Sequence, residues 1–246
     1  MTGAAPEPLL APDAFAARLR EEGVRRYHDQ HPFHELMHAG ALTRAQLQAW
    51  VLNRYYYQTR IPIKDALIVA KSEDPAFRRA WIRRIHDHDG NGADEPGGLA
   101  QWLRLAEGVG LDRGIVASCR EVLPGVRFAC DGYVTLVEKS PLVVAVASSL
   151  TEFFAPDLMS KRIAAWETHY PWVDREALGY FRARVVRARR DSEEAIQFVS
   201  ENARTRDLQE ACVMALIRKT EILWHLLDCV ERHVGTAMTP SRAREA

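Results

Sequence analysis

The sequence predicts an all-α protein that forms a single domain. Nearly every segment of its 246 residues has apolar positions spaced three and four residues apart, the period of an amphipathic helix. No stretch alternates apolar and polar residues as a half-buried strand does. No linker rich in Gly, Ser or Pro divides the chain, so we expect one domain rather than two.

Twelve helices are expected, each bounded by a cap, a proline or a change in periodicity. Thr43 with Gln46 forms a capping box, and Asp74 before Pro75 opens a later helix. Further breaks are expected at Pro62, Pro124-Gly125, Pro141, Pro156 and Pro171. The expected helical ranges are 13–29, 33–39, 43–60, 62–71, 75–88, 98–108, 112–122, 126–139, 141–155, 157–168, 175–201 and 205–233. Residues 1–12 and 235–246 are expected to be flexible tails around a helical catalytic domain of residues 13–234.

Length and composition support a single soluble protein of the size of an enzyme. Lys plus Arg and Asp plus Glu each number 33, so no overall charge attracts nucleic acid or an anionic membrane. The start of the chain lacks the pattern of a signal peptide, and the longest apolar run is too short to span a bilayer. The four cysteines have no close pairing and fall within helical patterns. We therefore expect a cytoplasmic protein with reduced cysteines.

Several polar side chains fall on helix faces that are otherwise apolar. Arg54 and Gln58 continue the apolar stripe of the helix expected over 43–60. Arg84 and His88 interrupt the stripe of 75–88 in the same way. Lys219 is the only charge on the long stripe of 205–233. Cations are therefore expected inside the bundle.

Three further segments point polar groups inward. Arg184 shares a stripe with apolar residues of 175–201, and Tyr180 lies one turn before it. Tyr133 lies on the apolar stripe of 126–139. Thr151 and Glu152 lie near the end of 141–155, which is apolar nearly all round and is expected to be a central helix.

Two interpretations of these inward cations are open. Each cation can pair with an internal carboxylate or extend past its neighbours to water. Carboxylates are scarce on the same stripes, however, and an unpaired buried cation costs several kcal/mol. A small ligand with several negative charges would balance the set.

Seven strings in the chain resemble those of the pyrroloquinoline-quinone synthase family. They are YHDQHPFHELMH, WVLNRYYYQTRIPIKDA, HDHDG, LPGVRFACDGY, SSLTEFFAP, HYPW and GYFRARV, in this order over most of the chain. The resemblance implies a haem-oxygenase-like helical bundle that works as a homodimer. It also implies an oxidase without metal or organic cofactor, which uses O2 to close a ring and remove eight electrons from the last, polycarboxylate precursor. The products implied are the quinone and H2O2.

The resemblance also implies a role for each matching residue. Catalytic roles fall on His88, Tyr180 and Arg184, with His88 as general base and the other two beside the oxygen that is reduced. The implied substrate-binding residues are His28, Arg54, Gln58, Lys64, Arg84, Tyr133, Thr151, Glu152, Arg162 and Lys219. Arg side chains suit bidentate binding of carboxylates.

Met159 is a departure from the family's pattern. The resemblance predicts a histidine near the oxygen pocket at this place, and methionine can neither donate a proton nor carry a charge. We expect slower or altered handling of oxygen intermediates, with the overall reaction intact. His86 is a poor substitute, because it is expected to face away from His88 on the same helix.

Three other functions are open from the sequence. The string HELMH, residues 34–38, fits the zinc motif H-E-x-x-H and contains one half of a helical di-iron motif. No second Glu-x-x-His occurs in the chain, which weakens the di-iron interpretation. A carrier that binds the quinone or its precursor without turnover would need the same cations. A thiaminase-like hydrolase would need a cysteine at the pocket.

Overall fold

The computed structural model describes residues 8–92 and 95–235, and it confirms the all-α fold class. Within these residues the β contacts amount to one isolated bridge between Gly90 and Pro96. The first helix begins at Pro12 and the last ends at Val234. Most of the two tails expected from the sequence, residues 1–7 and 236–246, lies outside the described residues.

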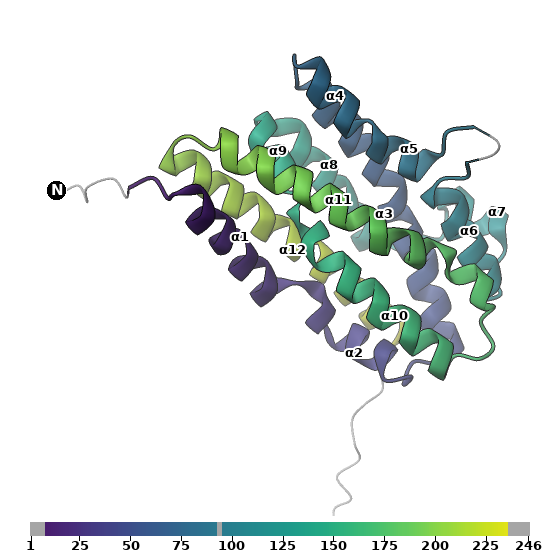
Figure 1. Cartoon of the computed structure of the whole chain (residues 1–246). Helices are drawn as coiled ribbons and strands as arrows, with labels where there is room; N and C mark the ends of the chain where they lie inside the picture. Colours follow the sequence, from purple (N-terminus) through teal and green to yellow (C-terminus); the bar gives the residue numbers. More distant parts are fainter. Residues whose placement is uncertain (1–7, 93–94, 236–246) are drawn as a thin grey trace, which may run out of the picture.

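The described chain is a bundle of α-helices joined by short connections (Figure 1). In Figure 1, α11 lies along α10 and α1 runs beside α12, and each pair is in contact. The elements are α1 (Pro12–Arg26), η1 (His28–Gln30), α2 (Pro32–His38), α3 (Arg44–Ala70), α4 (Pro75–Trp81), α5 (Arg83–Asp89), α6 (Gly98–Gly108), α7 (Arg113–Ser118), α8 (Pro124–Lys139), α9 (Leu142–Ala147), η2 (Leu150–Phe154), α10 (Ala155–His169), η3 (Arg175–Leu178), α11 (Gly179–Asn202) and α12 (Arg206–Val234).

The helix boundaries expected near Pro62 and within 75–88 were wrong. The break expected at Pro62 is absent, because α3 runs through this residue as one helix of 27 residues. A proline removes one backbone hydrogen bond, and the buried residues on both sides of Pro62 hold the helix together. The helix expected over 75–88 is instead divided at Ile82, whose carbonyl accepts from both Ile85 and His86. That tightened turn separates α4 from α5.

The expected central helix over 141–155 is also divided. Helix α9 ends at Ala147, and the 3-10 turn η2 leads into α10. The Ser148 hydroxyl donates to the Ala145 carbonyl at 2.6 Å, which satisfies a carbonyl near the end of α9. The segment Leu142–His169 is long and apolar enough to cross a membrane, but 72% of its most apolar window is buried inside the protein. It therefore has the burial of a core segment.

An aromatic cluster joins the helices around the centre of the bundle. Trp50 of α3 lies 5.5 Å from Trp102 of α6 and 6.0 Å from Trp166 of α10, between ring centroids. Phe181 of α11 packs against Trp102 and Trp166. The Trp102 indole N–H donates to the Val51 carbonyl at 3.0 Å and so fixes α6 on α3. This cluster supports one side of the cavity described next.

Candidate active site

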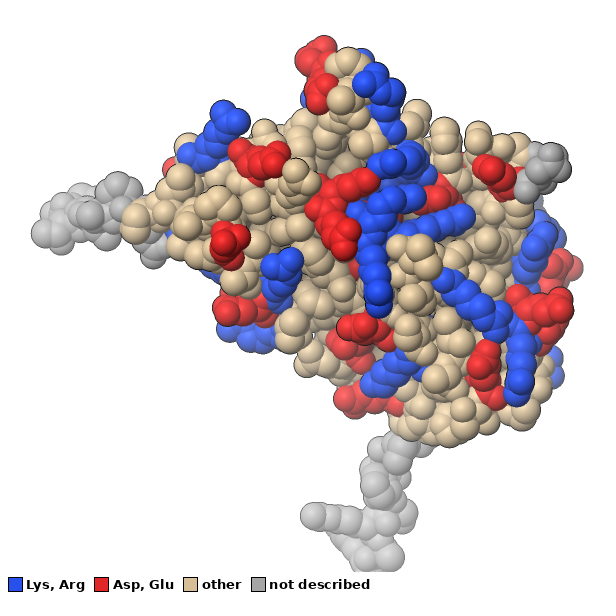
Figure 2. Space-filling model, in the orientation of Figure 1, with Lys and Arg blue, Asp and Glu red and all other residues tan. Residues whose placement is uncertain are grey.

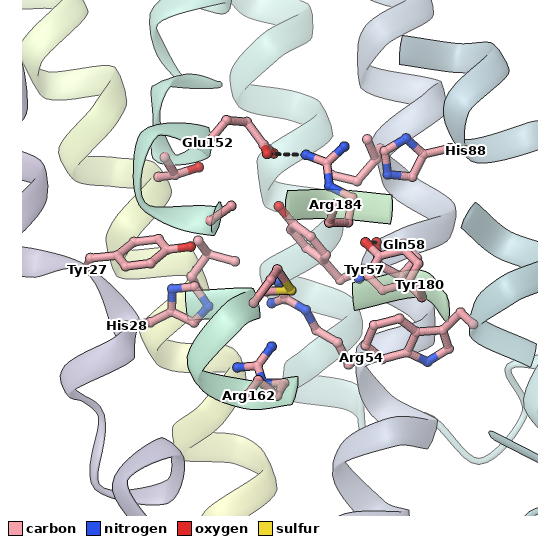
Figure 3. Close-up of a pocket in the computed structure, with 16 residues that line it drawn as sticks. Tyr27, His28, Arg54, Tyr57, Gln58, His88, Glu152, Arg162, Tyr180 and Arg184 are labelled. Atoms are coloured by element: carbon pink, nitrogen blue, oxygen red, sulfur yellow. Dashed lines mark hydrogen bonds and ion pairs between the residues drawn. The ribbon is translucent and has the colours of Figure 1, made fainter. Parts of the chain in front are cut away.

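A cavity of about 40 Å³ lies inside the bundle, and nine of the predicted residues line it (Figure 3). Its wall comes from the helices α3, α5, α6, α10, α11 and α12 and from the 3-10 turns η1 and η2. The nine are His28, Arg54, Gln58, His88, Thr151, Glu152, Arg162, Tyr180 and Arg184. Thr151 and Glu152 line this wall from the 3-10 turn η2.

Other lining residues were not predicted. Tyr27, Tyr57 and Trp102 contribute rings, and Ile61 and Leu223 contribute apolar surface. Tyr27 directly precedes His28 and could have been found from that neighbour. Tyr57 lies in a run of three tyrosines, in which the periodicity alone gives no preference for the residue that faces a ligand.

Four predicted binding residues lie buried outside the cavity lining. Lys219 donates to the Tyr57 hydroxyl at 2.8 Å, and its ammonium lies 3.4 Å from the ring centroid of Tyr133. Lys64 lies 2.6 Å from Asp65 Oδ1. Arg84 donates to a backbone carbonyl of α11 and stacks 3.8 Å from the Trp81 ring centroid. Substrate contact by Lys64, Arg84, Tyr133 and Lys219 stays a prediction.

Buried carboxylates compensate half of the cations, contrary to the expectation that inward carboxylates are scarce. Asp191 of α11 lies 4.0 Å from Arg84 Nε and 3.5 Å from Arg184 Nη1. Arg184 also donates to Glu152, as the dashed line in Figure 3 shows. Despite burial, Arg84, Arg184 and Arg190 hold the pKa of Asp191 below its usual value. The paired interpretation is therefore correct for Lys64, Arg84 and Arg184.

Arg54 and Arg162 line the cavity without such a partner. Among the described residues, no carboxylate oxygen lies within 4.0 Å of either guanidinium. Arg54 lies instead 4.0 Å from the Tyr57 ring centroid, and Arg162 lies 4.8 Å from that of Trp50. Burial, with help from Arg54, lowers the pKa of Arg162 to about 9. The cavity therefore has surplus positive potential that an anionic ligand would relieve.

The positive charge around the cavity also affects Lys219, which lies behind the lining residues. Burial, followed by repulsion from Arg54 and Lys64, lowers the pKa of Lys219 well below its ordinary value. Within the described residues its ammonium has no carboxylate within 4.0 Å. Its hydrogen bond to the Tyr57 hydroxyl holds the amine in place behind the cavity.

His88 is held in one tautomer by its own helix. Its Nδ1 lies 3.0 Å from the Arg84 carbonyl, which can only accept, so Nδ1 carries the proton. Nε2 therefore bears the lone pair. Burial, followed by the charge of Arg184, lowers the pKa of His88 and keeps the ring neutral. His86, two residues earlier, is exposed, which confirms that it faces away.

Tyr180 and Gln58 connect α11 to α3 across the cavity. The Tyr180 hydroxyl donates to Gln58 Oε1 at 2.7 Å, and both residues are buried. Its ring lies 4.8 Å from that of Trp102 at nearly a right angle. A base, a phenol and three guanidinium groups thus surround one small space, which suits proton removal from an anionic substrate and stabilisation of a reduced oxygen species.

The HELMH residues do not converge on a metal-binding geometry. His34 Nδ1 lies 2.8 Å from the His28 carbonyl, and His34 Nε2 lies 3.2 Å from Arg162 Nη2, so both ring nitrogens are engaged. Glu35 is exposed and lies away from this pair. This geometry disfavours the zinc and di-iron interpretations. The cavity lining includes no cysteine, which disfavours the thiaminase-like one.

Similarity to solved structures defines the class of fold. A domain of unknown function from Shewanella denitrificans OS217, with a heme oxygenase-like fold, superposes with a TM-score of 0.74 at 15% identity, covering 97% of this chain and 100% of that one. A TenA homolog from Pseudomonas syringae pv. tomato DC3000 gives a TM-score of 0.73 at 12% identity, covering 94% and 100%. The predicted haem-oxygenase-like bundle is confirmed.

Sequence similarity then defines the family. The TENA/THI-4/PQQC family matches residues 16–229, so the chain belongs to that family. It is 52% identical over 229 residues to the pyrroloquinoline-quinone synthase of Rhizobium meliloti (strain 1021), covering 93% of this chain and 88% of the relative. It is 46% identical to the synthase of Acidiphilium cryptum (strain JF-5), with 96% of each chain covered.

Buried neutral histidines predict a loss of stability in mild acid. Burial lowers the pKa of His28, His34 and His88 below 6.5, and that of His38 to about 3. Below pH 6.5 the unfolded chain binds protons that the folded chain cannot, so the free energy of unfolding falls. The expected slope is about 1.4 kcal/mol per pH unit for each such histidine. Urea unfolding between pH 7.5 and 5.5 measures it.

A pair of variants isolates the contribution of buried histidines to the pH dependence of the unfolding free energy. His28→Gln should flatten the pH dependence of the unfolding free energy, because it removes one buried imidazole. His86→Gln, at an exposed position, should leave the slope as in the wild type. Equal slopes for both variants would contradict this account.

Proposed function

We propose that this protein is a pyrroloquinoline-quinone synthase. It closes a ring in the bicyclic polycarboxylate precursor and oxidises it by eight electrons with O2, releasing H2O2. Relatives about half identical to the chain over most of its length carry that name. The observation that carries the proposal is the cavity, where the free Nε2 of His88 shares a small space with the uncompensated Arg54 and Arg162.

Substrate binding must enlarge the cavity. Small-molecule pockets commonly have volumes of about 300–1,000 Å³, whereas this one has about 40 Å³. A bicyclic precursor therefore enters only when surrounding elements move apart. Its carboxylates would form bidentate charged hydrogen bonds with Arg54 and Arg162 in place of their contacts with aromatic rings. These hydrogen bonds would offset the free-energy cost of moving the surrounding elements apart.

His88 and two residues of α11, Tyr180 and Arg184, have different chemical roles in this reaction. His88 Nε2 takes carbon-bound protons, while electron pairs pass from the electron-rich substrate directly to O2. Each O2 takes two electrons and two protons to form H2O2. Arg184 and Tyr180 stabilise the negative oxygen species that forms on the way. The Glu152 carboxylate holds Arg184 in place through their ion pair.

The first experiment mixes chelator-treated protein with the precursor in air and follows quinone absorbance and H2O2. The wild type should form both products. His88→Ala should reduce the rate by about 10²–10⁴-fold, the usual contribution of a general base. His86→Ala, on the exposed face of the same helix, should keep wild-type activity.

Other outcomes of that experiment identify the alternatives. Tight binding of the precursor without product would indicate a carrier. Activity that returns only when iron is added would indicate a di-iron oxidase and contradict the proposal.

Met159 tests the handling of oxygen. It is buried in the cavity wall one turn before Arg162, where the resemblance predicts histidine. Met159→His should add a proton donor and speed the decay of oxidation intermediates in a single turnover. Met159→Leu, which keeps the site apolar, should behave as the wild type. An unchanged rate and unchanged intermediates in Met159→His would refute the expected role.

We further propose a cytoplasmic homodimer, joined through a groove between α8 and α12. The groove has a volume of about 610 Å³, and Phe128 on its rim is 80% exposed. Two-fold association would let each Phe128 contact the groove of the other copy. Phe128→Glu should convert a dimer into a monomer in light scattering, whereas Val186→Glu, 73% exposed on α11, should not.

A cytoplasmic location agrees with four free cysteines, and recovery from the periplasm in cell fractionation would contradict it.

A further inference from the structure

Asp87, the residue before His88, is bound from the neighbouring helix α11. Arg187 Nε lies 3.2 Å from Asp87 Oδ1, and Arg190 Nη2 lies 2.5 Å from Asp87 Oδ2. Arg187 Nη1 also donates to the Asp87 backbone carbonyl at 3.0 Å. Two arginines therefore hold both the side chain of Asp87 and the peptide group that it shares with His88. None of these three residues lines the cavity.

The same contacts continue to the catalytic side of α11. Arg190 Nη2 donates to Asp191 Oδ1 at 2.8 Å, and Asp191 Oδ2 lies 3.5 Å from Arg184 Nη1. The Asp191 and Arg184 side chains are nearly inaccessible to solvent. A continuous series of charged contacts thus joins the backbone at His88 to the guanidinium of Arg184.

A short helix needs such contacts to fix its end. Helix α5 has seven residues, too few to be stable alone, and His88 lies in its last turn. From the other side the start of α6 packs closely against it. A Cβ at Gly98 would lie 3.3 Å from the Asp87 carbonyl oxygen, and a Cβ at Gly97 would lie 2.3 Å from that of His88. The peptide group of His88 is therefore held between α6 and α11.

We propose that Asp87 is a positioning residue, which binds Arg187 and Arg190 and thereby fixes His88 relative to Tyr180 and Arg184. The assignment to a catalytic base rests on the proposed function. Asp87 makes no contact with substrate in this role. Errors of about 1 Å in the position of a reacting group can cost about 100-fold in rate, so a contact one residue from the base matters.

Another ion pair between the same two helices, nearer the surface, supplies a matched control. Arg83 of α5 binds Glu194 of α11 near the surface. Acidic and basic side chains lie side by side on the face of the molecule drawn in Figure 2. If Asp87 only adds to general cohesion between α5 and α11, the loss of Glu194 should have the same consequences as the loss of Asp87.

The pKa of His88 gives a direct readout of its position. The charged groups that act on it are Arg184 of α11, Asp65 of α3 and Glu152 of η2, and burial is the largest influence. The start of α6 packs against the backbone at His88 through Gly97 and Gly98, which carry no charge. Loosening the α5–α11 contact would admit water, so the pKa of His88 should rise toward 6.5.

The experiment compares Asp87→Asn with Glu194→Gln. The imidazole of His88 is titrated by NMR, with His88→Gln identifying its signal, and the precursor is assayed for binding and single-turnover oxidation. Asp87→Asn should raise the pKa of His88 and slow oxidation about ten-fold, while precursor affinity stays within about two-fold because Arg54 and Arg162 lie on other helices. Glu194→Gln should match the wild type in all three measurements.

Two further variants test the proposal in case Asp87→Asn does not fold. Arg187→Gln and Arg190→Gln each remove part of the contact with Asp87 from partly exposed positions on α11, and each should shift the pKa of His88 in the same direction. An unchanged pKa in these variants and in Asp87→Asn, or an equal shift in Glu194→Gln, would overturn the proposal. If the wild type fails to oxidise the precursor, the proposed function fails, while the NMR titration still decides whether Asp87 positions His88.

Discussion

Positive charge buried in excess of negative charge is the constraint on which the rest of this structure depends. Arg54 and Arg162 line a small cavity, and Lys219 lies directly behind it. Aromatic rings lie against both guanidinium groups, at 4.0 Å from Arg54 to the Tyr57 centroid and 4.8 Å from Arg162 to the Trp50 centroid. Burial, followed by the positive charges of Arg54 and Arg162, lowers the pKa of His28 well below its usual value. The site is thus poised for an anionic ligand.

Under the proposed function, the distribution of carboxylates separates a binding half of the site from a catalytic half. On α11, Arg184 is compensated by Glu152 and Asp191 and keeps its geometry without a ligand. On α3 and α10, Arg54 and Arg162 have no carboxylate partner among the described residues, and the proposed function assigns them to the carboxylates of the precursor. A catalytic group works best when it is preorganised, whereas a binding group benefits from an unsatisfied charge. Both demands are met within one small cavity because different helices supply them.

Prediction from the sequence was most successful where a single helix determines the direction of a side chain. Arg54, Gln58 and His88 were placed inward by spacing alone, and all three line the cavity. Prediction failed where contacts between residues far apart in the chain determine the partner of a side chain or the boundary of a helix. Asp191 was missed as a partner because the helical pattern of its own segment does not reveal that Arg84, on another helix, points at it. Pro62 was misjudged because burial on both sides outweighs one lost hydrogen bond.

The sequence by itself determined that the chain is helical, that cations point into the bundle, and that its motifs match one family. These properties follow from local periodicity and residue identity, which need no knowledge of neighbouring helices. Only the tertiary structure decided which cations are compensated, which nitrogen of His88 is free, and that Asp87 is bound from α11. Those properties depend on atoms far apart in the chain, because the partners of a buried charge and the proton on a histidine ring are set by groups brought together through packing.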